Sequence, residues 1–309
     1  MKKVGGRLLA ICTTLALVLS VGCNNDNGDS SYSNETFFSF DITTDMREYA
    51  SPEYDSSQYF RGVCEAIRDV GKGAFMVSPG DIDPPWHVSN TITEILGSDY
   101  FWYPVVGNHE AETLEGMQWL REWGAVNAHS FVRIGPSNGT ETTYSFDYEN
   151  THFVVLNQYY DGESDVGTNG DVCDALYGWL QDDLEQNEKP VVFVFGHEPF
   201  VPVPDEDNGR LRHLNDSLNE HPENNHRFQA LLREHEVKAY ICGHTHNCSF
   251  SKINGLWQLD AGHARGIGDT GAKSTFLKVW ISGTQSTVEI YRYDGEGGFY
   301  SLAHVIALD

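Results

Sequence analysis

The stretch "RFQALLREHEVKAYICGHTH", residues 227–246, contains the repeating unit on which the fold depends. Its first half, "RFQALLREHEV", mixes apolar and charged residues as an amphipathic helix does. The apolar run "AYIC" that follows is typical of a buried strand, and Gly243 ends it. His244 and His246 then follow at alternate positions. A buried strand that ends in two imidazoles predicts a site at its carboxyl end.

The same helix–strand unit occurs elsewhere in the chain. The helical pattern of residues 56–71 precedes "AFMVS", and that of residues 176–187 precedes "PVVFVFGHE". Continuous apolar strands after amphipathic helices indicate parallel strands buried on both faces. Residues 35–45 alternate as a strand does, whereas residues 142–157 and 276–293 have the pattern of hairpins. The sequence therefore predicts a mixed α/β domain with two sheets.

Polar clusters stand at the carboxyl ends of the expected strands, where open α/β sheets build their sites. A glycine precedes the polar residue in most of them and lets the backbone turn sharply off the strand. Carboxylate, amide and imidazole donors suit Zn, Mn or Fe rather than a thiolate site. The candidate donors are Asp45, Asp81, Asn108, His109, His197, His244 and His246.

In order, "TTDMREY", "SPGDIDPP", "PVVGNHEAE", "FVFGHEPF" and "CGHTHN" resemble the motifs of the calcineurin-like metallophosphoesterase superfamily. The resemblance runs from about Phe37 to His246. It implies a four-layer α/β fold in which two mixed β-sheets pack as a sandwich flanked by helices. It also implies a dinuclear-metal phosphoesterase that hydrolyses phosphate mono- or diesters through a metal-bound hydroxide, with a histidine as general acid.

The resemblance assigns a role to each matching residue. Two divalent or trivalent metal ions, most suitably Mn, Zn or Fe, would share Asp81 as a bridge. His109 would face the substrate as the catalytic acid, and Glu110 would orient it. The expected metal ligands are Asp45 and His246 for the first ion, Asn108, His197 and His244 for the second, and Asp81 for both.

The first motif departs from the family pattern. Arg47 stands where the family has a histidine, and arginine cannot be a metal ligand because it does not lose its proton. The first ion would therefore have fewer protein ligands. Arg47 either contacts the substrate phosphate or lies on the surface. Asp41 is an alternative to Asp45, but the alternation of the strand continues past Asp41, which favours Asp45 at the strand end.

The N-terminus has the pattern of an export signal. A basic start precedes the apolar run Leu8–Val21, and "LSVGC" resembles a bacterial lipobox ending at Cys23, although Ser20 departs from it. The alternative is an ordinary cleaved secretory signal. We expect a signal peptide over residues 1–23, a flexible polar tether over 24–35 and one phosphoesterase domain over 36–309. The protein would then be extracytoplasmic, in the periplasm or cell envelope, and attached to the membrane by lipid.

Charge and cysteine content narrow the function further. The formal charge is −25, and it becomes −28 when residues 1–22 are removed, because Lys2, Lys3 and Arg7 go with them. Such a surface repels nucleic acid phosphates, so a small phosphate ester is the expected substrate. Oligomeric state is not indicated. Two disulfides are possible in an oxidising compartment, with three possible pairings among Cys64, Cys173, Cys242 and Cys248.

Three further regions are candidates for the rim of the site. The long polar connection Pro204–Phe228 offers Arg212 and His213 as substrate contacts. His87 and His263 are weaker candidates, with surface and turn positions as the simpler interpretation. The competing hypothesis for the whole chain is a metal-binding surface lipoprotein of the same fold with weak or no catalysis. The departure at Arg47 favours it, whereas the presence of His109 and Glu110 argues against it.

Overall fold

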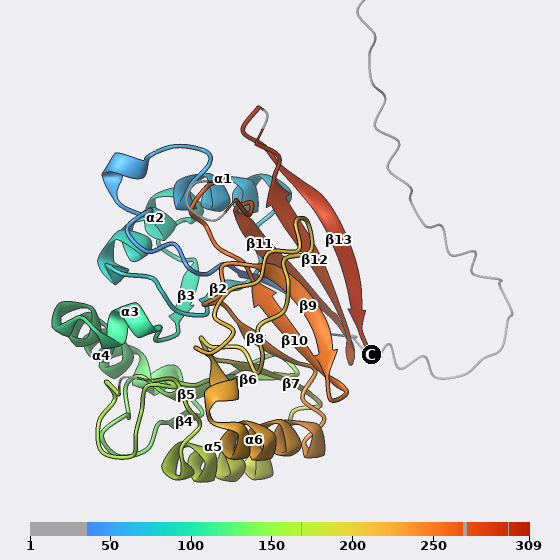
Figure 1. Ribbon diagram of the computed structural model, residues 1–309. Coiled ribbons are helices and arrows are strands. Elements are labelled where there is room, and N and C mark those ends of the chain that lie inside the picture. Colours follow the sequence, from blue (N-terminus) through green and yellow to red (C-terminus); the bar gives the residue numbers. More distant parts are fainter. Residues whose placement is uncertain (1–35, 168, 268–270, 296) are drawn as a thin grey trace, which may run out of the picture. The chain divides into compact units, whose positions relative to one another are not determined.

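The computed structural model describes residues 36–309 except 168, 268–270 and 296 (Figure 1). The expected signal peptide, lipobox and tether lie outside these residues. Two mixed β-sheets pack face to face with helices on their outer sides, which confirms the expected α/β sandwich. In the part of the chain that is described, no helix has the length and apolar character needed to cross a membrane.

The first sheet has six strands in the order β13-β12-β11-β1-β2-β3. β1, β2 and β3 are parallel, and β11 joins β1 antiparallel. The hairpin expected over residues 276–293 forms β11 and β12. The strands are β1 (Phe37–Ile42), β2 (Phe75–Ser78), β3 (Phe101–Pro104), β11 (Thr275–Ser282), β12 (Gln285–Tyr293) and β13 (Tyr300–Leu308).

The second sheet has seven strands in the order β4-β5-β6-β7-β8-β10-β9. β6, β7, β8 and β10 are parallel, as the continuous apolar runs predict. The hairpin expected over residues 142–157 forms β5 and β6. The strands are β4 (Arg133–Ile134), β5 (Tyr144–Tyr148), β6 (Thr151–Val155), β7 (Val191–Phe195), β8 (Ala239–Cys242), β9 (Cys248–Ile253) and β10 (Leu256–Ala261).

An aromatic core joins the two sheets. Phe40 of β1 packs with its ring centroid 5.4 Å from Phe75 in its own sheet and 5.1 Å from Phe153 in the other. Tyr103 and Phe146 stack across the same interface with centroids 3.6 Å apart. Aromatic side chains bury large areas with few rotatable bonds, so this contact holds the sheets rigidly together. The carboxyl ends of the strands in the two sheets are thereby held in fixed positions relative to one another.

Helices cover the outer face of each sheet (Figure 1). α1 and α2 pack on the six-stranded sheet, and α5 and α6 pack on the seven-stranded sheet. Gly71 ends α1, as its position after the apolar pattern predicts. The helices are α1 (Phe60–Val70), α2 (Pro85–Leu96), α3 (Asn108–Ala111), α4 (Leu114–Asn127), α5 (Asp174–Gln186) and α6 (Pro222–Glu234), with 3-10 turns η1 (Pro52–Tyr54), η2 (Ala128–Ser130) and η3 (Leu218–Glu220).

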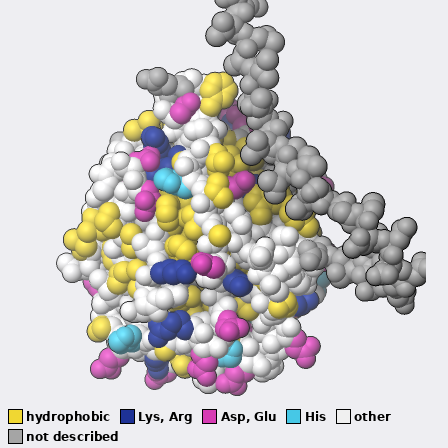
Figure 2. All heavy atoms as spheres, turned by 90° about the vertical axis from the view of Figure 1, so that its right-hand side faces the viewer, with side chains coloured by type: hydrophobic (Ala, Val, Ile, Leu, Met, Phe, Trp, Pro, Cys, Tyr) yellow, Lys and Arg dark blue, Asp and Glu magenta, His cyan; other side chains and the backbone are white. Residues whose placement is uncertain are grey.

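β13 forms the outer edge of the six-stranded sheet and exposes Leu302 and Val305. The view from that side shows hydrophobic side chains interspersed with charged groups of both signs (Figure 2). Cys64, Cys173, Cys242 and Cys248 are all free, so neither of the two possible disulfides forms among them. Burial raises the pKa of the Cys242 and Cys248 thiols, which keeps both protonated.

Candidate metal centre

Loops from both sheets meet at one edge of the sandwich. Asp45, Asp81 and Asn108 follow β1, β2 and β3, while His197 and His244 follow β7 and β8. The His197 ring nitrogen Nδ1 lies 2.7 Å from the Pro79 carbonyl oxygen, and the His244 amide donates to Asp45 Oδ2 at 3.0 Å. These bonds run between the sheets, so the polar clusters lie together as expected.

The backbone at this edge is unusual. Asp45, Asp81, His244 and His246 have φ between 51° and 69°, a left-handed conformation that Asp and His tolerate better than most residues. Gly80 has φ 88°, and a side chain there would place its Cβ 2.8 Å from the Gly107 Cα. Such conformations cost about 1–3 kcal/mol each and cluster at functional sites.

The hydrogen bonds of two histidines direct their lone pairs inward. A carbonyl oxygen only accepts, so His197 donates through Nδ1 to Pro79, and its neutral ring has a lone pair at Nε2. His244 likewise donates through Nε2 to the Asp216 carbonyl oxygen at 2.7 Å, which leaves its lone pair at Nδ1. The two lone-pair nitrogens lie 3.2 Å apart.

Two oxygen acceptors complete this half of the centre. Asn108 Oδ1 lies 3.2 Å and Asp81 Oδ1 3.3 Å from His197 Nε2. Acceptors without a proton between them repel one another, whereas a cation in their midst binds them all. Bonds of about 2.0–2.1 Å at octahedral or tetrahedral angles separate neighbouring donors by about 2.8–3.4 Å. The expected ligands of the second ion therefore fit a metal.

The other half of the centre is less regular. Asp45 Oδ1 is buried without a hydrogen-bond partner and lies 3.4 Å from His246 Nε2. Arg212 places its Nη1 2.5 Å from His246 Nδ1, and because arginine only donates, Nδ1 is the acceptor. His246 is thus not oriented by a carbonyl as His197 and His244 are. The orphaned Asp45 oxygen still fits a cation.

Burial sets the protonation of the centre. It lowers the pKa of His244 to about 3, with the neighbouring His197 and His213 adding to the effect, and it lowers the pKa of His246 well below its usual value. Burial also raises the pKa of Asp45, aided by the Asp81 and Asp260 carboxylates. Neutral imidazoles are the form that binds metals, and a cation reverses the penalty on the carboxylates.

The comparison with protein families agrees with this geometry. A family model described as calcineurin-like phosphoesterase matches residues 38–248. The chain belongs to the calcineurin-like phosphoesterase family. This membership confirms the resemblance found in the motifs, and it accounts for the candidate metal ligands at one sheet edge.

Solved structures share the fold of this calcineurin-like phosphoesterase at low sequence identity. A structure titled as GAP50, the anchor in the inner membrane complex of Plasmodium, is 14% identical with a TM-score of 0.55. The match covers 88% of this chain and 89% of that one. A structure of PhoD is 12% identical with a TM-score of 0.57, over 88% of this chain and 70% of that one. No curated protein matches.

In this calcineurin-like phosphoesterase, the choice between two aspartates follows from their partners. Asp41 is buried against Lys278 Nζ at 3.1 Å and the Tyr100 hydroxyl at 2.6 Å. Both partners satisfy its charge away from the centre. Asp45 instead lies beside His244 and His246. Its position supports Asp45 as the donor.

Glu110 does not orient His109, which corrects the expectation from the sequence. Its carboxylate accepts from the amides of Asp81 at 3.0 Å, Ile82 at 2.8 Å and Gly107 at 2.7 Å. These bonds hold the turn that carries Asp81 against the start of α3. Glu110 therefore positions the expected bridging carboxylate instead of the expected catalytic histidine, His109.

His109 faces the pocket, and Arg47 lies beside it. Arg47 Nη1 lies 3.1 Å from His109 Nε2, while its Nε pairs with Asp83 Oδ2 at 3.2 Å. The other ring nitrogen, Nδ1, lies 3.5 Å from Glu112 Oε2. Of the two interpretations of Arg47, the structure favours the contact with the site over a place on the open surface.

The connection Pro204–Phe228 contributes to the pocket and then enters α6 at Pro222. Arg212 and His213 line the pocket, as expected. His263 is buried, with its ring centroid 5.9 Å from that of His246, and it is not among the residues that line the pocket. His87 lines neighbouring pockets instead.

The sequence did not single out four residues that line the pocket: Glu112, Glu198, Asp216 and Arg265. Asp216 holds His213 at 2.8 Å through its carboxylate and His244 through its carbonyl oxygen. Burial raises the pKa of Glu198 to about 7. Arg265 follows β10, as the other clusters follow their strands, and this position was the signal that would have identified it.

Proposed function

We propose that this protein is an exported, metal-dependent hydrolase of small phosphate esters, with two metal ions at the centre. The proposal is carried by one observation: lone pairs from His197, His244, Asn108 and Asp81 converge without a proton between them. Family membership supports ester hydrolysis, because the model is that of a phosphoesterase. Cations bound there would supply positive charge for phosphate oxygens and acidify a water molecule.

The residues of the chain do the remaining work. Asp81 would contribute to both halves of the centre, because its carboxylate forms one candidate ligand group with Asp45 and His197. The backbone amide of His109 donates to Asp81 Oδ1 at 3.3 Å. Glu110 keeps the Asp81 turn in place. Asp216 fixes the ring of His244 through its carbonyl oxygen. Contacts of this kind typically change metal affinity 10–100-fold when removed.

In hydrolysis, an oxygen from water bonds to phosphorus and the bond to the ester oxygen breaks. The departing oxygen takes a proton, which His109 supplies from Nε2 as general acid. Arg47 now occupies the Nε2 side of this ring. We therefore expect the guanidinium to turn toward the substrate phosphate when the ester binds, which frees Nε2 to carry its proton.

The cellular setting follows from the sequence. The export signal and the lipobox at Cys23 support a location in the periplasm or cell envelope with a lipid anchor. The formal charge of −25 supports small substrates over nucleic acid. Mn, Zn and Fe are the ions that this donor set suits best.

Elemental analysis of the purified protein, together with turnover of phosphate esters in the presence of each added metal, tests the proposal. We expect two ions per chain and turnover that disappears with a chelator and returns with metal. One ion per chain without turnover of any ester would instead support the metal-binding lipoprotein.

A further inference from the structure

Three arginine side chains reach the pocket from three separate loops. Arg47 follows β1, Arg212 lies in the connection between β7 and α6, and Arg265 follows β10. The pocket that they line also contains Asp81, Asn108, His244 and His246. A concentration of guanidinium groups is unexpected in a chain with 45 acidic and 20 basic residues. Their convergence indicates a highly anionic ligand.

Each guanidinium is held in place by a neighbour. Arg265 packs over the ring of Tyr49, with its Cζ 4.8 Å from the centroid, and its Nη1 lies 3.4 Å from both ring nitrogens of His246. Arg212 lies closer to the same imidazole and donates to its Nδ1. Two guanidiniums therefore lie against the ring of His246. Arg47 is held by Asp83 on the His109 side.

The carboxylates on the pocket wall have partners of their own. Glu198 accepts from the Tyr159 hydroxyl at 2.9 Å and from the Gly170 amide at 3.1 Å. Asp216 pairs with His213 at 2.8 Å, and Glu112 lies 3.5 Å from His109 Nδ1. No carboxylate among the described residues pairs with Arg212. The N–H groups of Arg212 therefore face a pocket in which the carboxylates of Glu198, Asp216 and Glu112 already contact other residues.

The number of cationic groups distinguishes two classes of phosphate ester. A monoester carries a charge of about −1.5 to −2 at pH 7 and three strong acceptor oxygens. A diester carries one negative charge and two such oxygens, and its second alcohol occupies the third position. A guanidinium that faces this alcohol loses its charge-assisted hydrogen bond and is desolvated without compensation.

Resting on the proposed function, we propose that this pocket selects phosphate monoesters, and that Arg212 and Arg265 bind the phosphate oxygen that a diester lacks. Arg47 lies next to the proposed acid, on the side where the alcohol departs. The two arginines are then determinants of specificity. Arg47 serves both classes of ester.

Two esters with the same leaving group test this selectivity on the purified full chain with its metals. We expect kcat/KM for p-nitrophenyl phosphate to exceed that for methyl p-nitrophenyl phosphate by at least about a hundredfold. Arg212→Gln and Arg265→Gln should each reduce the monoester value by about ten- to a hundredfold, since each loses a charge-assisted hydrogen bond. The diester value should change less than about threefold. Arg68→Gln changes an exposed residue of α1 and removes the same charge outside the pocket. It should change neither the monoester nor the diester value.

A binding measurement gives the same comparison without turnover. In calorimetric titrations, orthophosphate should bind at least about a hundredfold more tightly than dimethyl phosphate. Arg212→Gln should reduce this ratio of affinities by weakening the binding of orthophosphate. If both esters turn over equally well, or if the arginine variants lower both to the same extent, the selectivity is refuted and the hydrolase stands. If neither ester turns over with any metal, the hydrolase itself is refuted.

Discussion

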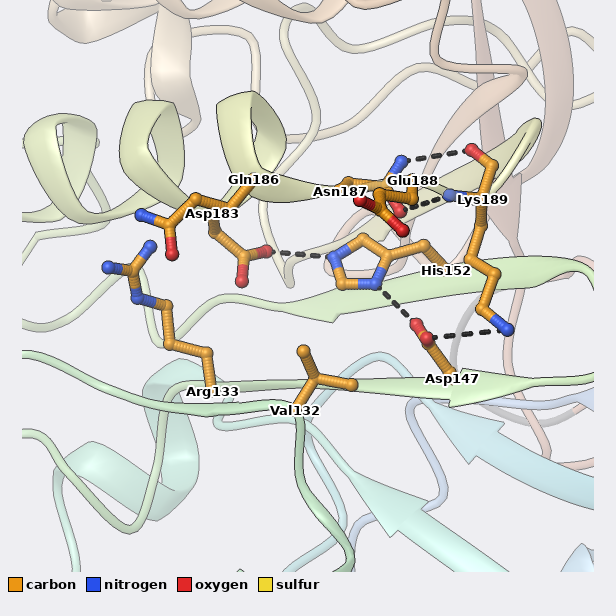
Figure 3. A pocket seen from close by; sticks show the side chains of 9 residues that line it. All are labelled: Val132, Arg133, Asp147, His152, Asp183, Gln186, Asn187, Glu188 and Lys189. Carbon is orange, nitrogen blue, oxygen red and sulfur yellow. Dashed lines mark hydrogen bonds and ion pairs between the residues drawn. The ribbon is translucent and has the colours of Figure 1, made fainter.

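Buried histidines occur in two regions of this molecule, and their pKa values shift in opposite directions. His152 of β6 lies between two carboxylates, with Nδ1 2.7 Å from Asp147 and Nε2 2.9 Å from Asp183 (Figure 3). Burial acts to lower its pKa, but the hydrogen bonds and charges of Asp183 and Asp147 outweigh burial and raise it. At the metal centre, burial lowers the pKa of His244 to about 3.

The difference shows that the partner, more than burial, decides what a buried imidazole does. His152 has a carboxylate at each nitrogen, so its protonated form is favoured where β5, β6 and α5 meet. His197 and His244 donate to backbone carbonyls, so each remains neutral with a lone pair facing the centre. One arrangement stabilises the fold, and the other leaves room for a cation.

The largest expected effect comes from removing the charge at the centre. Asp81→Asn should lower the metal content of the purified protein and reduce turnover by more than about a hundredfold, because loss of a direct ligand exceeds the 10–100-fold loss of affinity or activity typical of supporting residues. Elemental analysis and ester turnover measure the two quantities. Asp69→Asn, an exposed site on α1, is the matched control. If metal content and turnover are both unchanged in Asp81→Asn, Asp81 is misassigned as the bridge.

Next in size is the effect of the proposed acid. His109→Ala should lower turnover of an alkyl phosphate by about 10²–10⁴-fold, because an alkoxide needs a proton to depart. Turnover of p-nitrophenyl phosphate, whose leaving group needs no proton, should fall much less. His129→Ala changes an exposed histidine and should leave both rates intact. Equal losses for the two esters would contradict the acid role.

The second region should respond in stability only. Asp183→Asn removes a charged partner of His152, and we expect the free energy of unfolding to fall by about 2 kcal/mol. Metal content and kcat should stay at the wild-type values. Urea denaturation of Asp183→Asn and of Asp182→Asn, its exposed neighbour on α5, measures the difference. A loss of metal from Asp183→Asn would mean that the two regions are not independent.

The smallest effect is a change with pH. The folded protein binds the His152 proton more tightly than the unfolded chain, whose pKa is about 6.5. The resulting stability is complete below that pH and is lost as pH rises through the higher folded pKa. Glu198, with its pKa raised to about 7, acts in the same direction. As pH rises from 6, the free energy of unfolding of His152→Gln should therefore fall less than that of the wild type. If the two curves of unfolding free energy against pH are parallel, His152 is not an imidazolium in the folded protein.

Periodicity and motifs were enough to predict the architecture and to place most of the candidate donors at the strand ends where they meet. The apolar runs that became β7 and β8, and the glycine after each, are local signals that tertiary packing did not override. His152 gave no such signal, because it stands inside β6, whose residues are all buried, and not in a polar cluster at a strand end. Its partner Asp183 is 31 residues away, on a helix.

The sequence by itself determined which elements form and where chemically active side chains stand along them, because those properties depend on neighbours a few residues apart. Only the tertiary structure decided that Glu110 holds the Asp81 turn, that Arg265 joins Arg212 at His246, and which nitrogen of His197 faces inward. Lone-pair direction and protonation depend on groups brought within about 3 Å by folding. In this chain such groups are often more than a hundred residues apart, as Pro79 is from His197.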